Sequence, residues 1–101
     1  MAEFRDVASL EELAEGGQMA VLAQGREIGL FHIDGNIYAI DNVCLHRGGP
    51  LAEGALEGCV VSCPFHAWTF DVRTGICTFN ESIRQETFQT RVEEGRILVK
   101  V

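Results

Sequence analysis

Short segments in which apolar and polar residues alternate make up most of this chain. A period of two is typical of strands that bury one face. In the segment 27–33, Ile28 and Leu30 share one face and Phe31 lies on the other. The Asp34-Gly35 pair that follows is a strong signal for a two-residue hairpin turn. The chain therefore has the pattern of antiparallel strands joined by tight turns.

Many short strands at close spacing predict an all-β fold, a sandwich or a barrel. The 101 residues are enough for one domain, which we expect to span residues 1–101. Ser9 with Glu12 three residues later fits a capping box, so a short helical turn is expected there. Residues 79–85 are expected to be irregular. The expected strands cover residues 4–8, 19–23, 27–33, 36–40, 59–62, 69–72, 87–92 and 96–101, with Ile97, Leu98 and Val99 buried on both sides.

The composition excludes several classes of protein. No apolar stretch reaches the roughly 18 residues that cross a bilayer, and the N-terminus lacks the pattern of a secretory signal. A cytoplasmic protein is therefore expected. The net charge is −7, with eight acids against two bases in residues 1–43. Because such a chain repels phosphate groups, nucleic acid and membrane surfaces are poor partners, and a protein with a basic patch is a better one.

Two segments lack the alternation, at about 42–51 and 63–68, and both contain cysteine and histidine, the residue types that bind metals. The first has Cys44 and His46 before Gly-Gly-Pro, and the second has Cys63 and His66. The pattern is C-x-H, sixteen residues, then C-x-x-H. Each loop thus offers one thiolate and one imidazole, with a short strand between the loops. Loops on a rigid scaffold commonly carry function.

Three interpretations of this pattern remain open. A tetrahedral zinc site could use two Cys and two His, but C-x-H places its ligands closer in sequence than is usual. A [2Fe–2S] cluster with two Cys on one iron and two His on the other is the Rieske arrangement. The third interpretation is unliganded thiols and surface histidines. Four ligand-type residues on two glycine-flanked loops of a small domain favour the cluster.

The residues that carry these loops resemble the Rieske-type ferredoxins over nearly the whole chain. The resemblance rests on the hairpin at 34–40, on C-x-H-x-G-G-P-L, on C-P-x-H, and on Phe70-Asp71-x-x-Thr74-Gly75. It implies an antiparallel β-sandwich with a small cluster-binding subdomain. It also implies that Cys44 and Cys63 bind the buried iron and that His46 and His66 bind the outer one. Ala67 departs from the glycine that is usual after the second histidine.

The resemblance implies an electron carrier with no catalytic residues of its own. Such a carrier takes single electrons from a flavin-dependent NAD(P)H reductase and passes them to a terminal oxygenase that hydroxylates aromatic rings. We expect a monomer with transient partners. The alternatives are a small subunit of an assimilatory NAD(P)H nitrite reductase and, from a different class, a zinc-stabilised interaction module.

Residues outside the loops restrict the function further. A mononuclear iron of the oxygenase type needs two His and a carboxylate. With His46 and His66 assigned to the cluster, only His32 remains, and we expect it to be an ordinary packed histidine. Cys59 and Cys77 are expected to be small buried hydrophobes. Phe65 and Trp68 are candidates for shielding the cluster from water.

The resemblance also predicts a low reduction potential. High-potential relatives link their two loops by a disulfide, but this chain has Gly49 and Phe65 at those positions. Two hydroxyls that donate to the cluster or its cysteines in those relatives are replaced by Trp68 and Phe70. Hydrogen bonds to the sulfurs stabilise the reduced state, so we expect a value near the low end for Rieske centres, roughly −150 mV.

Overall fold

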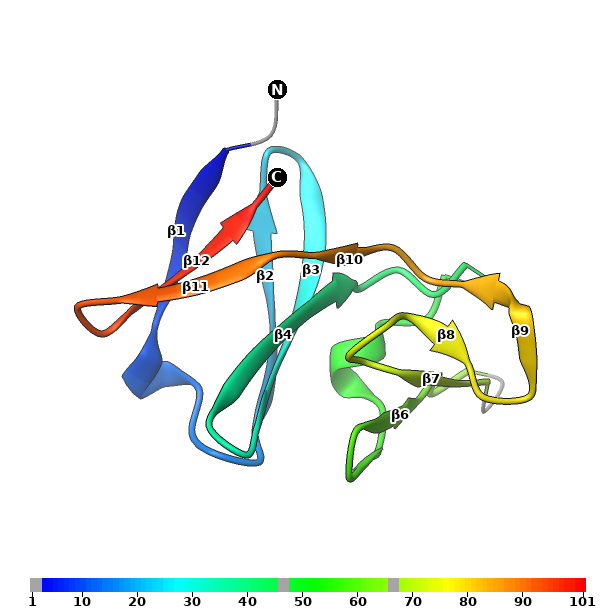
Figure 1. Cartoon of the computed structure of the whole chain (residues 1–101). Coiled ribbons are helices and arrows are strands. Elements are labelled where there is room, and N and C mark those ends of the chain that lie inside the picture. The colour runs from blue at the N-terminus through cyan, green and yellow to red at the C-terminus, as the bar shows by residue number, and fades with distance from the viewer. Residues whose placement is uncertain (1–2, 46–47, 66–67) are drawn as a thin grey trace.

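The computed structural model describes residues 3–45, 48–65 and 68–101, which form three antiparallel sheets (Figure 1). The first sheet has the order β1 (Phe4–Ser9), β12 (Arg96–Lys100), β11 (Thr90–Glu93). The second has the order β10 (Thr87–Phe88), β4 (Asn36–Asp41), β3 (Arg26–Ile33), β2 (Gln18–Ala23). The third has the order β5 (Leu56–Glu57), β6 (Val60–Ser62), β7 (Thr69–Asp71), β8 (Ile76–Cys77), β9 (Asn80–Arg84). The predicted all-β sandwich with a smaller subdomain is confirmed.

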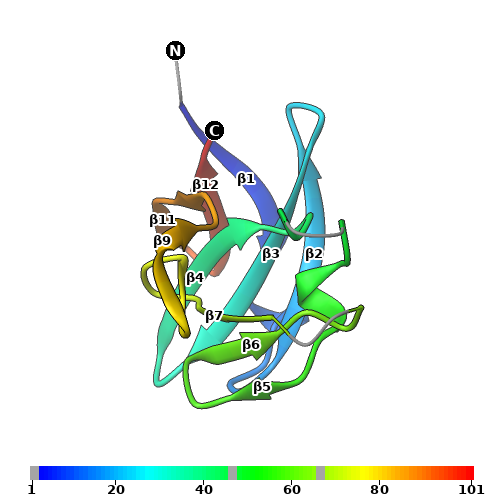
Figure 2. The same ribbon diagram turned by 90° about the vertical axis from the view of Figure 1, so that its right-hand side faces the viewer.

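The three sheets form layers. The first sheet packs on one side of the second, and the third sheet lies beside β3 and β4 on the other side (Figures 1 and 2). Two single-turn 3-10 helices, η1 (Leu10–Glu12) and η2 (Leu51–Glu53), are the only helical elements in the part of the chain that the structure describes. No helix there is long and apolar enough to cross a membrane.

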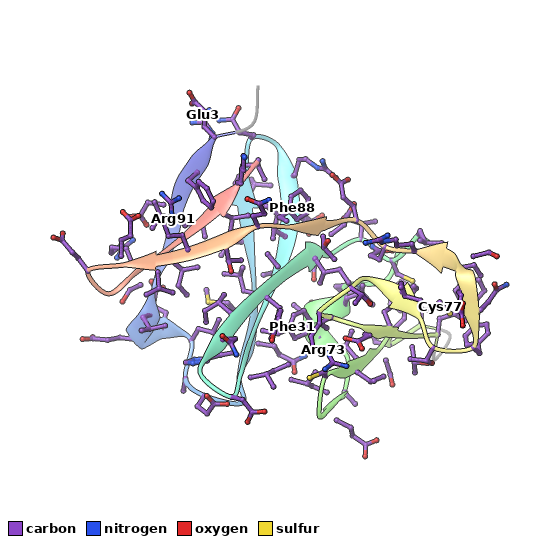
Figure 3. The ribbon with its side chains drawn as sticks, in the orientation of Figure 1. Glu3, Phe31, Arg73, Cys77, Phe88 and Arg91 are labelled. Carbon is purple, nitrogen blue, oxygen red and sulfur yellow. The ribbon has the colours of Figure 1, made fainter. Side chains whose placement is uncertain are left out.

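Strand β3 separates two hydrophobic cores. Ile28 and Leu30 belong to the core between the first and second sheets. Phe31 and Ile33 belong to the core beneath the third sheet, and Figure 3 shows Phe31 on that side. The two faces predicted from the alternation are therefore correct, and both of them are buried because β3 has a sheet on each side.

The predicted hairpin and capping box are confirmed. Asp34 and Gly35 have φ values of 50° and 80°, as a type I′ turn requires, and Ile33 pairs with Asn36. The hydroxyl of Ser9 accepts from the backbone N–H of Glu11, and the Glu12 carboxylate accepts from the N–H of Ser9 at 2.8 Å. Local sequence signals thus fix both features.

The structure differs from the sequence prediction in several places, and the two-residue strands β5 and β8 were not predicted at all. Residues 79–85, expected to be irregular, contain strand β9 at the exposed edge of the third sheet. The expected strand 87–92 is two strands, because the chain passes from the second sheet to the first at Gln89. Leu98 is only half-buried between the buried Ile97 and Val99, so both-sided burial was wrong there.

Candidate metal centre

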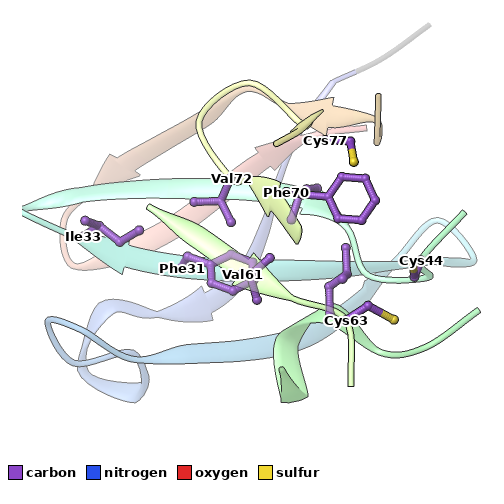
Figure 4. Close-up of a cluster of buried hydrophobic side chains, with 10 residues drawn as sticks. Phe31, Ile33, Cys44, Val61, Cys63, Phe70, Val72 and Cys77 are labelled. Atoms are coloured by element: carbon purple, nitrogen blue, oxygen red, sulfur yellow. The ribbon is translucent and has the colours of Figure 1, made fainter. Parts of the chain in front are cut away.

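Cys44 and Cys63 lie in one buried cluster of side chains, although they belong to different loops. Their exposed fractions are 1% and 2%. Cys44 follows β4, and Cys63 follows β6 of the third sheet. Figure 4 shows both at the same end of the cluster, near Phe70. The two predicted cysteine ligands are thus brought together, while His46 and His66 lie outside the described residues.

Backbone hydrogen bonds close the first loop on itself. The N–H of Cys44 donates to the carbonyl of Gly49 at 2.9 Å, and the N–H of Gly48 donates to the carbonyl of Cys44 at 2.7 Å. Val43 forms an antiparallel bridge with Pro50. Gly48 has a φ of +74°, a conformation that favours glycine. The Gly-Gly-Pro sequence is therefore what turns the chain back after Cys44.

The second loop is the turn of the β6–β7 hairpin. Ser62 pairs with Thr69, and the N–H of Cys63 donates to the carbonyl of Trp68 at 2.7 Å. This bond brings the two ends of the loop together at the end of the β6–β7 hairpin.

The two loops touch at Gly49. A Cβ atom built on Gly49 would lie 2.7 Å from the Sγ of Cys63 and 3.1 Å from the Cγ of Phe65. Real Cβ atoms essentially never come as close as 2.7 Å, and 3.1 Å is already a tight contact, so the close approach of the loops requires glycine here. The first loop therefore passes directly over the second cysteine.

The residues present fit a cluster held by two thiolates on the protein side. All four cysteines are among the described residues, and no disulfide joins any of them. Within residues 3–45, 48–65 and 68–101, no group of three metal-binding side chains comes together. Cys44 and Cys63 form the described half of the predicted set. Thiolates are the soft ligands that iron–sulfur clusters take, and both of these are buried on adjacent loops.

Apolar side chains stand at the surface of the two loops. Leu45 is 51% exposed and Phe65 is 60% exposed. Trp68 is half-buried, packs against the buried cluster and meets the Phe79 ring edge-on at 5.3 Å. Phe65 lies against the Gly49 position beside Cys63, and its role in shielding a cluster from water stays a prediction. The exposed parts of Leu45 and Phe65 form an apolar surface on the two loops.

The remaining cysteines and histidine occupy structural positions. Cys77 is 1% exposed in the buried cluster, as predicted, whereas Cys59 is only half-buried. The Nδ1 of His32 lies 2.8 Å from the carbonyl oxygen of Leu13, and its Nε2 lies 3.5 Å from a Glu15 carboxylate oxygen. His32 is therefore a packed histidine that joins neighbouring segments, as expected.

Arginine side chains hold three acids of the described chain in ion pairs. The Arg26 guanidinium contacts Glu86 at 2.5 Å and Asp41 at 3.4 Å, where β4 leads into the first loop. Hydrogen bonding from Arg26 lowers the pKa of Glu86. Figure 3 labels Arg73, whose guanidinium bonds both carboxylate oxygens of Asp71 and holds the pKa of that carboxyl below its usual range. These acids stay ionised near neutral pH.

Two buried amides that the sequence analysis missed hold the first loop. Asn42 is 2% exposed, and its Oδ1 accepts from the N–H of Ala52 at 2.7 Å. Gln85 is also 2% exposed, and its side chain bonds the backbone on both sides of Cys44. No local pattern marks either residue, because their partners are backbone groups rather than a motif.

Comparison with known proteins agrees with this geometry. The family model of the Rieske [2Fe-2S] domain matches residues 3–94. The ferredoxin component of the naphthalene 1,2-dioxygenase/salicylate 5-hydroxylase systems from Ralstonia sp. is 37% identical over 99 residues, which cover 95% of this chain and 93% of the relative.

Solved structures extend the likeness to the fold. The ferredoxin of carbazole 1,9a-dioxygenase from Nocardioides aromaticivorans IC177 has a TM-score of 0.88 and 30% identity, covering 95% of each chain. A chain of the complex of reduced oxygenase and oxidized ferredoxin in carbazole 1,9a-dioxygenase has a TM-score of 0.87 and 27% identity, covering 96% of this chain and 92% of its own length.

The nitrite reductase alternative finds support in the fold alone. A nitrite reductase small subunit from Mycobacterium tuberculosis has a TM-score of 0.90 but only 24% identity over all of this chain and 96% of its own. The Rieske family match implies one Rieske-type [2Fe–2S] cluster, which replaces the zinc interpretation. The chain belongs to the Rieske [2Fe–2S] family, among the ferredoxin components of ring-hydroxylating dioxygenase systems.

Proposed function

We propose that Cys44 and Cys63 bind the inner iron of the cluster and that His46 and His66 bind the outer iron. The observation that carries this proposal is the contact between the loops at Gly49, which places both buried thiols at one end of the molecule. Two ferric ions, two sulfides and two thiolates sum to zero charge with neutral imidazoles. Adding an electron to a neutral centre is easier than adding one to an anionic four-thiolate centre.

The chain is an electron-carrying ferredoxin component, so its residues bind a redox centre and perform no bond chemistry of their own. In the proposed cycle it takes one electron from a flavin-dependent NAD(P)H reductase and delivers it to a terminal oxygenase. Backbone hydrogen bonds hold the chain at Cys44 and Cys63, which limits the movement of these two ligands between the redox states. A small structural change on reduction favours fast electron transfer.

The oxygenase docks, in this proposal, on the surface formed by Leu45 and Phe65. Both side chains are more than half exposed, and both belong to the ligand loops. An exposed apolar surface with a polar surround is typical of a protein interface. The solved complex of a similar ferredoxin with its oxygenase supports a direct contact of this kind. We further propose a single-domain, monomeric, cytoplasmic protein that exchanges its partners.

The test compares substitutions of two exposed leucines, one on a ligand loop and one on strand β2. Leu45→Ser changes the proposed docking surface, and Leu22→Ser changes an edge-strand residue that is 71% exposed on β2. Both holoproteins are titrated into a reaction with a purified reductase and a ring-hydroxylating oxygenase, and electron delivery is followed by stopped-flow absorbance. We expect slower delivery with Leu45→Ser and no change with Leu22→Ser. Equal rates for the wild-type protein and Leu45→Ser would contradict the docking surface.

A further inference from the structure

We propose that Gln85 is a positioning residue that sets the geometry of the first ligand loop on both sides of Cys44. The proposal rests on the assignment of Cys44 as a cluster ligand under the proposed function. It concerns a residue from another part of the chain, 41 positions after Cys44 in the sequence.

The backbone of Gln85 is itself firmly held. The residue lies between β9 and β10, and its N–H donates to the carbonyl of Gly75 at 2.7 Å. A Cβ atom at Gly75 would collide with the carbonyl oxygen of Gln85, so the two backbones are in direct contact. At 2% exposure the side chain has little solvent to bond and little space to move. Gln85 is thus a fixed support.

The amide group of Gln85 makes three hydrogen bonds to the backbone of the loop. Its Nε2 donates to the carbonyl oxygens of Asp41 at 2.9 Å and Val43 at 2.5 Å. Its Oε1 accepts from the N–H of Leu45 at 3.1 Å. Two donors and one acceptor therefore meet three backbone groups within five consecutive residues.

The positions of these bonds determine what they control. Val43 precedes Cys44 and Leu45 follows it, so the amide fixes the chain where it enters and where it leaves the ligand. Because the Leu45 N–H points at Gln85, it is not a donor to a sulfur of the centre. Hydrogen bonds to the sulfurs tune the reduction potential, so releasing this N–H alters the centre as well as the loop.

The Asp41 carboxylate accepts from the N–H of Val43 at 2.9 Å and so holds the chain before Cys44 only, whereas two other anchors act further along the loop. Asn42 accepts from the N–H of Ala52, and Gln18 donates from Nε2 to the carbonyls of Ala52 and Gly54 at 2.7 and 2.6 Å. These bonds hold the chain at η2, after the loop has turned back. Gln85, in contrast, bonds the backbone on both sides of Cys44.

The test uses Gln85→Met, which keeps the length of the side chain and removes all three bonds. Thr90→Val is the matched control, because it removes one side-chain bond to the carbonyl of Ile37, which lies on β4 well before the loop. Reconstituted holoproteins are compared by protein-film voltammetry, by electron paramagnetic resonance of the reduced state and by the rate of iron loss to a chelator.

We expect Gln85→Met to shift the potential, to change the resonance line shape and to lose iron about 10-fold faster, the typical effect of losing an outer-shell partner. Thr90→Val should lower thermal stability only. A Gln85→Met protein that is less stable but keeps the wild-type potential, line shape and iron-loss rate would overturn the positioning role. It would leave the proposed function intact. A wild-type protein that binds no cluster would overturn both.

If Gln85→Met does not fold, amide hydrogen exchange of the wild-type holoprotein tests the proposal instead. The Leu45 amide should be protected although its side chain is half exposed, because its N–H is bonded to Gln85. Unprotected exchange at Leu45 would show that this bond does not persist in solution and would overturn the proposal.

Discussion

Gly49 faces the thiol of Cys63 so closely that a Cβ atom there would lie 2.7 Å from the sulfur. The contact joins the two ligand loops, since Gly49 also accepts a backbone hydrogen bond from Cys44. The spacing between the cysteines thus depends on a residue that has no side chain.

Replacing Gly49 with alanine should therefore reduce cluster content. The new methyl group displaces Cys63 or Phe65, and the ligand geometry changes. The iron-to-protein ratio and the visible spectrum measure this effect. Gly35→Ala is the control, because Gly35 has a positive φ but nothing within 4 Å, so it costs about 1 kcal/mol of stability without affecting the cluster. Full iron content in Gly49→Ala would contradict the steric argument.

The ligand assignment predicts opposite results for two pairs of substitutions. His46→Ala or His66→Ala removes an anchor of the outer iron, so the cluster is lost or becomes labile. Cys59→Ser and Cys77→Ser should keep the cluster. Cys77 is buried, so placing a hydroxyl there should lower the free energy of unfolding by about 1–3 kcal/mol. Iron analysis and unfolding curves separate the two effects. Loss of iron in Cys59→Ser together with full retention in His66→Ala would show the assignment to be wrong.

The reduction potential should be near −150 mV, the low end for Rieske centres. Phe70 is fully buried in the cluster of side chains that contains Cys44 and Cys63, so Phe70→Tyr places a hydroxyl beside the sulfurs and should raise the potential. Phe88→Tyr, on β10, is the control and should leave it unchanged. Protein-film voltammetry measures all three proteins. A wild-type value above about +100 mV would mean that the missing hydroxyls and disulfide do not set the scale.

Electron delivery to the oxygenase should slow as salt is added. The chain has a net charge of −7, and screening weakens its attraction to a basic partner over about 10 Å at 0.1 M ionic strength. Stopped-flow rates across a salt series test this, with a small uncharged oxidant as the control that should show no dependence. A salt-independent rate with the oxygenase would argue against an electrostatic role of the acidic surface.

Features with a local signal could be predicted from the sequence. The turn at Asp34-Gly35 and the two faces of β3 follow from backbone preference and from alternation. Strand β9 could not be predicted, because an exposed edge strand such as Asn80–Arg84 needs no apolar face. Gln85 could not be predicted either, because its bonds reach backbone groups 40 to 44 residues away. The loop motifs were enough to predict that Cys44 and Cys63 lie in one site, and the structure places them in one buried cluster. The placement of His46 and His66 stays a prediction.

Pulsed electron paramagnetic resonance of the reduced wild-type protein tests the central claim most directly, because nitrogen nuclei bound to iron couple to its unpaired electron. The account predicts a [2Fe–2S] signal with two strongly coupled nitrogens, one from His46 and one from His66. A colourless protein containing zinc, or an iron–sulfur signal without coupled nitrogen, would contradict it.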